Sequence, residues 1–244
     1  EARGPLLFCL QVAKQMGHSA NDLAVAGLAL LPVGFRAYQL GLLPACMSPS
    51  CLVDIRWWLM VAGLSALYFM HGFIWHCSST FTAMCGQAPL RNLGSHPVEV
   101  FAALEVFGKA EQLATLLLFL GDSGRSAAWE ALLSAPLWCW ALFAVYVVIG
   151  QTLNLMMYSA IGNAGVYYGF KMGREVPWCS GFPFNVGLRH PQYVGVVLTL
   201  FGGLAVLLCE EVAALGLAQG VLAWAAMYVA MSAMEQAGDN DKKE

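Results

Sequence analysis

The sequence predicts an all-α fold: a polytopic transmembrane helix bundle with five or six membrane segments. Composition is the first observation, because 59% of the 244 residues are apolar and only 11% are charged, whereas an ordinary soluble domain is about 25% charged. The second is a series of long apolar runs, several of which approach the roughly 20 residues that a helix needs to cross a bilayer core. The chain is therefore expected to be embedded in lipid over most of its length, as a single domain.

The first three predicted segments carry helix-boundary signals. The run 23–43 is closed by a proline, and the run 57–75 has aromatic residues at both ends, as membrane-interface anchors do. The third run, 97–120, starts at a proline suited to the first helical turn and is expected to end at Gly121.

The third segment is unusually charged for a membrane helix. Glu105 and Lys109 stand four residues apart and are expected to pair on one helix face. Two interpretations are open: an interfacial helix that carries a structural ion pair, or a helix that lines a polar cavity.

The remaining segments are predicted at 136–158, 193–209 and 212–234. Only Glu210 and Glu211 separate the last two, so these should form a tight hairpin with its turn in water. The fifth run is short, and this leaves the count at five or six.

The basic residues predict the orientation. Eight lie on the face that holds both chain ends, the 2–3 loop and the 4–5 loop, namely Arg3, Lys14, Arg91, Lys171, Arg174, Arg189, Lys242 and Lys243. Two, Arg56 and Arg125, lie on the other face. By the positive-inside rule the first face should be cytosolic.

Charge and cysteine usage exclude some classes of partner. A net charge of −3 without a long basic run argues against a nucleic-acid partner. None of the eight cysteines forms a C-x-x-C pair, so no metal site is expected. Cys46 and Cys51 flank one loop and could pair in an oxidising lumen.

Chemistry is expected in the segment 161–195, where glycines alternate with aromatic and charged residues. Gly162, Gly165 and Gly169 permit either close helix packing or close approach of the backbone to a ligand. Further along, the run R-H-P-Q-Y-V-G places Arg189 and His190 at the start of the fifth helix.

A helix start of this kind favours an anionic group, such as a carboxylate or a phosphate. Tyr193, in the first turn, can face a cation. Glu235, near the end of the last helix, is a carboxylate where the helix dipole disfavours one, so another interaction should hold it there.

Three motifs of this chain resemble the phospholipid N-methyltransferases, and the plant-type members most. They are G-N-A-G-V-Y-Y-G-F-K-M-G-R-E-V-P-W-C-S-G-F-P-F, L-R-H-P-Q-Y-V-G and the late glutamate. The resemblance implies S-adenosylmethionine as methyl donor, a phospholipid acceptor, phosphatidylcholine as product and residence in the endoplasmic reticulum membrane. It covers about residues 150–235, so the catalytic core is expected at 150–244, with an N-terminal extension of two helices at 1–96. The implied donor-binding residues are Gly150, Gly162, Gly165, Tyr168, Gly169, Arg189, His190 and Glu235.

Methyl transfer to an amine requires an unprotonated nitrogen, and a positioned carboxylate can take the proton. The expected catalytic residues are Glu235, His190 and Tyr193, with Glu235 either as this base or as a ligand of the donor. Three alternatives remain: an isoprenylcysteine carboxyl methyltransferase, which has a similar R-H-P-x-Y-x-G element, a membrane sterol reductase, and a non-enzymatic lipid carrier.

Overall fold

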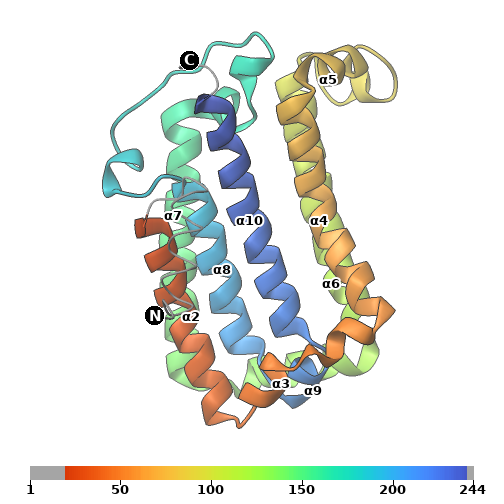
Figure 1. Cartoon of the computed structure of the whole chain (residues 1–244), viewed down its shortest axis with the longest axis vertical. Coiled ribbons are helices and arrows are strands. Elements are labelled where there is room, and N and C mark those ends of the chain that lie inside the picture. Colours follow the sequence, from red (N-terminus) through yellow and green to blue (C-terminus); the bar gives the residue numbers. More distant parts are fainter. Residues whose placement is uncertain (1–19, 241–244) are drawn as a thin grey trace, which may run out of the picture.

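Long helices run side by side through most of the molecule (Figure 1). The structure is a computed structural model that describes residues 20–240, and every regular element in this range is helical. The main helices are α2 (Ala20–Gln39), α4 (Ile55–His76), α6 (Pro97–Ser134), α7 (Leu137–Val166), α8 (Pro191–Leu207) and α10 (Leu217–Asn240). Shorter turns connect them, namely α3 (Leu43–Met47), η1 (Pro49–Val53), α5 (Ser78–Cys85), η2 (Leu90–Asn92), η3 (Gly169–Lys171), η4 (Phe184–Val186) and α9 (Glu210–Ala214).

The apolar character of these helices confirms the membrane helical bundle. Within the described range, three helical stretches are long and apolar enough to cross a membrane, Ile55–His76, Leu137–Lys171 and Leu217–Glu235, and Pro191–Leu207 is a shorter apolar helix. The helices α2 and α6 run beside them (Figure 1). The count of five or six membrane segments stays a prediction.

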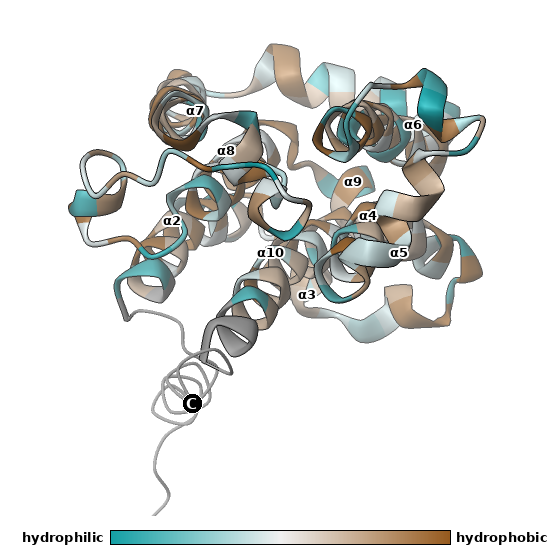
Figure 2. Ribbon diagram, turned by 90° about the horizontal axis from the view of Figure 1, so that it is seen from above, coloured by the Kyte–Doolittle hydropathy of each residue, from teal (hydrophilic) through white to brown (hydrophobic). Residues whose placement is uncertain are grey.

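The helix α10 lies at the centre of the bundle. It packs against α8 on one side and α4 on the other, while α2 and α7 cover α8 and α6 covers α4. Seen from above (Figure 2), α7 is almost entirely in hydrophobic colours, and hydrophilic colours gather in the loops and on part of α6. At the loop end, α4 and α6 stand apart from α8 and α10, and these helices converge at the opposite end of the bundle (Figure 1).

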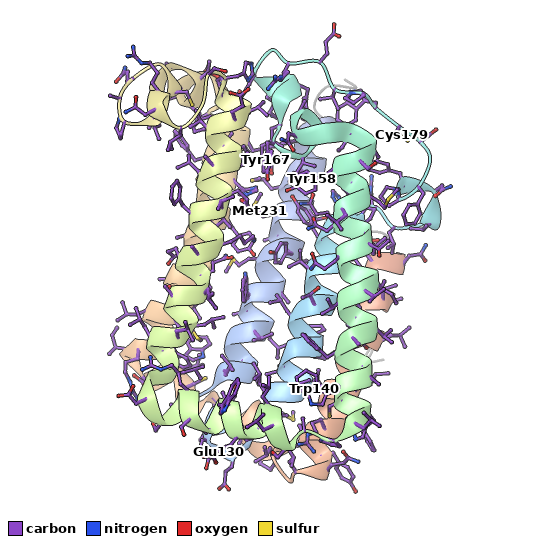
Figure 3. All side chains as sticks on the ribbon, turned by 180° about the vertical axis from the view of Figure 1, so that it is seen from behind. Glu130, Trp140, Tyr158, Tyr167, Cys179 and Met231 are labelled. Carbon is purple, nitrogen blue, oxygen red and sulfur yellow. The ribbon has the colours of Figure 1, made fainter. Side chains whose placement is uncertain are left out.

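Several predicted helix boundaries are corrected. The first segment, predicted at 23–43, is α2 and ends at Gln39, and Pro44 lies in the first turn of α3 and does not close the run. Gly121 adopts φ 60°, a conformation that glycine alone adopts easily, but the helix resumes after it and α6 continues to Ser134. Gly121 is therefore a kink and not an end, and the part after it, with Glu130, lies along the far end of the bundle (Figure 3). In the same way, α7 extends beyond residue 158 to Val166, with a non-helical Gly162 near its end.

The predicted hairpin between the last two helices is confirmed. After α8 ends, α9 carries the exposed Glu210 and Glu211, and Gly216 with φ 83° starts the return. However, α10 runs to Asn240, so Glu235 lies inside this helix and not at its end. The unfavourable dipole argument for Glu235 therefore does not apply, and its side-chain contacts must explain its place.

The tightest helix contact joins α7 to α8. A Cβ atom added to Gly150 would lie 2.2 Å from the carbonyl oxygen of Gly195, and one added to Gly195 would lie 2.4 Å from the carbonyl oxygen of Gly150. Small residues at this crossing let the two backbones touch, as in other membrane helix pairs. Near the other end of the bundle, Cys46 and Cys51 are free thiols and do not pair.

Candidate active site

A cavity of about 360 Å³ lies at the loop end of the bundle, within the range of small-molecule sites. Residues from α4, α7, the 167–190 loop, α8 and α10 line it, so it unites parts of the chain that are more than 150 residues apart. We call it the donor cavity, because it gathers most of the residues that the sequence resemblance assigns to donor binding. Its lining includes Trp75, Gly165, Tyr168, Phe170, Trp178, Arg189, His190, Gln192, Tyr193 and Glu235.

The carboxylate of Glu235 is the most strongly held group in the donor cavity. The hydroxyl of Tyr168 donates to its Oε1 at 2.7 Å, and the hydroxyl of Tyr193 donates to the same oxygen. The Nδ1 atom of His190 lies 3.8 Å from Oε2, and the ring of His190 stacks on that of Tyr193. Hydrogen bonds to an ionised acceptor are stronger than those between neutral groups. These contacts fix a largely buried negative charge at the cavity wall.

Aromatic rings also line the donor cavity. The ring of Trp75 on α4 packs edge-on against that of Tyr168, with 5.0 Å between the ring centres, and its centre lies 6.1 Å from that of Phe170. The ring of Phe170 in turn contacts that of Trp178. The backbone of Tyr168 is left-handed, with φ 55°, which non-glycine residues rarely adopt and which is often found at ligand sites. Aromatic faces attract cations, so these rings and the carboxylate of Glu235 suit a positively charged ligand.

The loop is attached to the helices by charged side chains. Lys171 Nζ lies 3.9 Å above the ring centre of Trp75 and donates to its carbonyl oxygen at 3.0 Å. Arg174 lies 3.6 Å from Glu99 at the start of α6. These contacts hold the loop over the donor cavity.

The start of α8 differs from the expectation in one respect. Pro191 occupies its first turn, as predicted, and Arg189 and His190 precede it. However, the carboxylate of Asp22 on α2 accepts the backbone N–H groups of Arg189 at 3.0 Å and His190 at 3.3 Å. The anion at this position is therefore one of the chain's own side chains, which fixes the loop end to α2.

A second cavity, of about 260 Å³, adjoins the first and shares Gln192 and Tyr193 with it. Glu105 and Lys109 line it, with Glu105 Oε1 at 3.4 Å from Lys109 Nζ. The predicted ion pair is confirmed, and so is the interpretation that this helix lines a polar cavity. We call this space the inner cavity.

The structure brings six of the predicted site residues together around the donor cavity, namely Gly165, Tyr168, Arg189, His190, Tyr193 and Glu235. The other three glycines lie outside its lining. Gly150 packs against Gly195, Gly162 is the kink near the end of α7, and Gly169 begins η3, where an added Cβ would lie 2.7 Å from a backbone oxygen. A direct role of these three in donor binding stays a prediction.

Residues of the first helices complete the site and were not singled out as site residues from the sequence. They are Asp22 on α2 and His71 and Trp75 on α4, and the Nε2 atom of His71 lies 2.7 Å from Glu105 Oε2. One feature of the sequence could have indicated two of them. Asp22 and His71 are polar residues within or next to apolar runs, and such residues usually face the bundle interior. Their partners, however, lie 34 to 168 positions away.

Removing the Asp22 carboxylate should loosen the loop end and, with it, the cavity where the sequence resemblance predicts donor binding. Loss of a capping carboxylate costs about 0.5–2 kcal/mol, so we expect Asp22→Ala to raise the dissociation constant for adenosylhomocysteine by about 2- to 30-fold in titration calorimetry. Asp54→Ala is the matched control, because Asp54 caps α4 at the far end and Arg56 holds its carboxyl pKa below the usual value. It should leave the affinity unchanged, and an equal effect of both variants would contradict the local role of Asp22.

Comparison with known proteins agrees with the geometry. The family model described as phospholipid methyltransferase matches residues 138–237, which include α7, the loop, α8 and most of α10. The chain is also 30% identical, over 181 residues, to a protein of Arabidopsis thaliana named phosphatidyl-N-methylethanolamine N-methyltransferase, covering 74% of this chain and 93% of that protein. No solved structure matches the chain. With its helical bundle, a family match over the loop and last helices and a relative that spans most of its length, the chain belongs to the phospholipid methyltransferase family.

Proposed function

We propose that this protein transfers methyl groups from S-adenosylmethionine to phosphatidyl-N-methylethanolamine and phosphatidyl-N,N-dimethylethanolamine, and so produces phosphatidylcholine. The name of the Arabidopsis relative supports this acceptor class. The observation that carries the donor assignment is the carboxylate of Glu235, held by two tyrosine hydroxyls in a cavity that aromatic rings line. Such a cavity is suited to a sulfonium cation.

The residues present fit a cationic donor with a carboxylate of its own. Glu235 supplies a negative charge for the cationic end, Arg189 supplies a positive group for the carboxylate, and Trp75 and Trp178 offer ring faces. The donor supplies an electrophilic methyl group when bound. Of the two roles open to Glu235, we favour donor ligand over proton acceptor, because its carboxylate lines the donor cavity and not the inner one.

The proposal extends to the place of the protein in the cell. We propose a multi-pass protein of the endoplasmic reticulum membrane whose chain ends and 167–190 loop face the cytosol. In the described residues, Arg91, Lys171, Arg174 and Arg189 belong to the loop end, and Arg36, Arg56 and Arg125 to the opposite end, with Arg36 inside the last turn of α2. The larger number at the loop end supports this orientation by the positive-inside rule. The predicted positions Arg3, Lys14, Lys242 and Lys243 lie outside the described residues.

We further propose that the chain acts as one domain. The segment 150–244 would supply most donor contacts, and α4, from the first 96 residues, would complete both cavities through Trp75 and His71. Lipid would enter sideways between helices, and the donor would enter from the cytosolic loop end.

A comparison of three acceptors tests the function. The purified full chain in mixed micelles, supplied with labelled S-adenosylmethionine, should methylate the mono- and dimethylated forms of phosphatidylethanolamine, and should turn over the unmethylated form at least tenfold more slowly. Prenylcysteine serves as the control acceptor for the carboxyl methyltransferase alternative. Labelling of prenylcysteine alone, or of no acceptor, would contradict the proposal.

A further inference from the structure

The inner cavity has a different position from the donor cavity. It lies among α4, α6, α7, α8 and α10, and Tyr158, Tyr167 and Met231, which line it, are seen between α6 and α7 in Figure 3. Although α6 and α7 are consecutive in the chain, they contact each other at few points. On the α6 side its lining includes the exposed Val106 and the half-exposed Lys109. The inner cavity therefore reaches the outer surface at a side of the bundle that apolar helices flank.

The charges in the inner cavity complement a zwitterion. Glu105 is largely buried, and its Oε1 lies 3.4 Å from Lys109 Nζ, so an anion and a cation stand side by side. The head of an aminophospholipid likewise carries a phosphate and an ammonium group a few atoms apart. Lys109 is half-exposed at the side of the bundle and lies one helical turn farther from the loop end than the largely buried Glu105, so the phosphate, which lies on the acyl-chain side of the ammonium, would meet Lys109.

Aromatic hydroxyls surround the carboxylate of Glu105. Tyr158 on α7 and Tyr167 just after it line the cavity on one side, and their hydroxyl oxygens are 2.8 Å apart. Tyr228 on α10 lines it on another side. Lys109 Nζ already lies 5.7 Å from the ring centre of Tyr228. Lys109 Nζ also donates to the hydroxyl of Tyr228 at 3.2 Å, so the cavity holds one ammonium group of the chain beside a carboxylate and a tyrosine hydroxyl. The tyrosine rings that line the cavity are surfaces that a methylated ammonium group would contact.

A chain of polar contacts leads from the inner cavity to the donor cavity. Glu105 Oε2 lies 2.7 Å from His71 Nε2, His71 Nδ1 lies 3.3 Å from the hydroxyl oxygen of Tyr168, and that hydroxyl donates to Glu235. His71 is thus held by contacts at both ring nitrogens, to the hydroxyl of Tyr168 and to Oε2 of Glu105. The other carboxylate oxygen of Glu105, Oε1, faces Lys109.

Resting on the proposed function, we propose that the inner cavity binds the phosphate and ammonium groups of the lipid acceptor and that Glu105, oriented by His71, is the residue that removes the ammonium proton. The proton passes to Glu105 and leaves a neutral nitrogen with a free electron pair. That pair forms the new nitrogen–carbon bond while the carbon–sulfur bond breaks and its electrons stay on sulfur. The positive charge thus moves from sulfur to nitrogen. Glu105 is a catalytic residue in this scheme and His71 a positioning residue.

The electrostatic surroundings of Glu105 come from every helix around it. From α4 and α6 these are His71, Tyr68 and Lys109. From α7 and its following turn come Tyr158 and Tyr167, from α8 Tyr193 and from α10 Tyr228, with Glu235 beyond Tyr168. Within the inner cavity's lining, Glu105 is the one carboxylate among the described residues, so a change of pH that acts on a carboxylate base there acts on this group.

The test compares Glu105→Gln with wild type in steady-state methylation of phosphatidyl-N-methylethanolamine from pH 7 to 9, with adenosylhomocysteine affinity measured by calorimetry on the same samples. A positioned base contributes about 10²–10⁴-fold, so the rate at pH 7 should fall at least 100-fold. The rate of Glu105→Gln should then rise about tenfold per pH unit, because the unprotonated fraction of an alkylamine with a pKa near 10 grows tenfold per pH unit below that value. The wild-type rate should change less over the same range. Donor affinity should stay within about twofold of wild type. His71→Asn should give a smaller loss with the same recovery at high pH.

Glu111→Gln is the matched control on α6. Glu111 is exposed and accepts a hydrogen bond from Thr115 outside both cavities, so activity and pH profile should match wild type. Lys109→Ala should raise the KM for the lipid at least fivefold and lower kcat less, as expected for a phosphate contact.

Full activity of Glu105→Gln, or a loss with an unaltered pH profile, would overturn the inference. If Glu105→Gln no longer binds adenosylhomocysteine, Glu105→Asp decides: a partial loss that high pH relieves supports the inference, and an unchanged rate contradicts it. Wild-type protein that methylates no aminophospholipid would instead contradict the proposed function itself, so the two failures are distinguishable.

Discussion

Replacing Glu235 by glutamine is expected to lower kcat/KM for methyl transfer by at least about 100-fold. The carboxylate accepts hydrogen bonds from Tyr168 and Tyr193 and lies near His190. Hydrogen bonds to a charged group are worth about 1.5–3 kcal/mol each, and every 1.4 kcal/mol is a factor of ten. Glutamine keeps the shape but removes the charge that a cationic donor would meet.

The affinities for S-adenosylmethionine and adenosylhomocysteine, both measured by calorimetry, test whether the Glu235 carboxylate contacts the sulfonium group. Glu235→Gln should weaken the binding of S-adenosylmethionine more than that of adenosylhomocysteine, because only the first carries a positive sulfur. Glu211→Gln is the matched control, since Glu211 is exposed on α9 at the opposite end of the bundle, and it should change neither constant. An equal weakening of both ligands by Glu235→Gln would contradict a contact with the sulfonium.

The second large effect is expected on stability, from Gly150→Ala. Its new methyl group would lie 2.2 Å from the carbonyl oxygen of Gly195 and 2.8 Å from Thr199 Oγ1, and the backbone cannot move as a side chain can. Overpacking costs about 1–3 kcal/mol, and a contact this close with backbone belongs at the upper end. At about 2–4 °C per kcal/mol for a chain of this size, the midpoint of thermal unfolding should fall by roughly 6–12 °C.

Gly203→Ala on α8 is the control for helix composition. No atom lies within 4 Å of the position that its Cβ would take, and alanine is favoured over glycine within a helix by about 1 kcal/mol. We therefore expect an unchanged or slightly higher midpoint, read from tryptophan fluorescence of the purified protein in detergent. A similar fall for both variants would show that the α7–α8 crossing is not the reason.

Several features of this protein could be predicted from its sequence because they depend on local chemistry. A helix proline at position 97 or 191, an apolar run of membrane length and an ion pair four residues apart each need only neighbouring residues. The same applies to the loop motif, whose Tyr168, His190 and Tyr193 lie together around the donor cavity. The predicted ends of several helices failed, at Gly121, at the end of α7 and at the end of α10, because a glycine or a polar residue within a helix can be read as its end although the helix continues beyond it.

Tertiary structure alone decided the partners of the buried charges. The sequence by itself determined a membrane helix bundle with a reactive segment at 161–195 and a late glutamate, because composition and motifs are local properties. It did not determine that Asp22 holds the start of α8, that Glu235 meets Tyr168 and Tyr193, or that Glu105 meets His71. A charge buried among apolar helices requires a partner, but which helix supplies that partner depends on how α4, α6, α8 and α10 pack around one another.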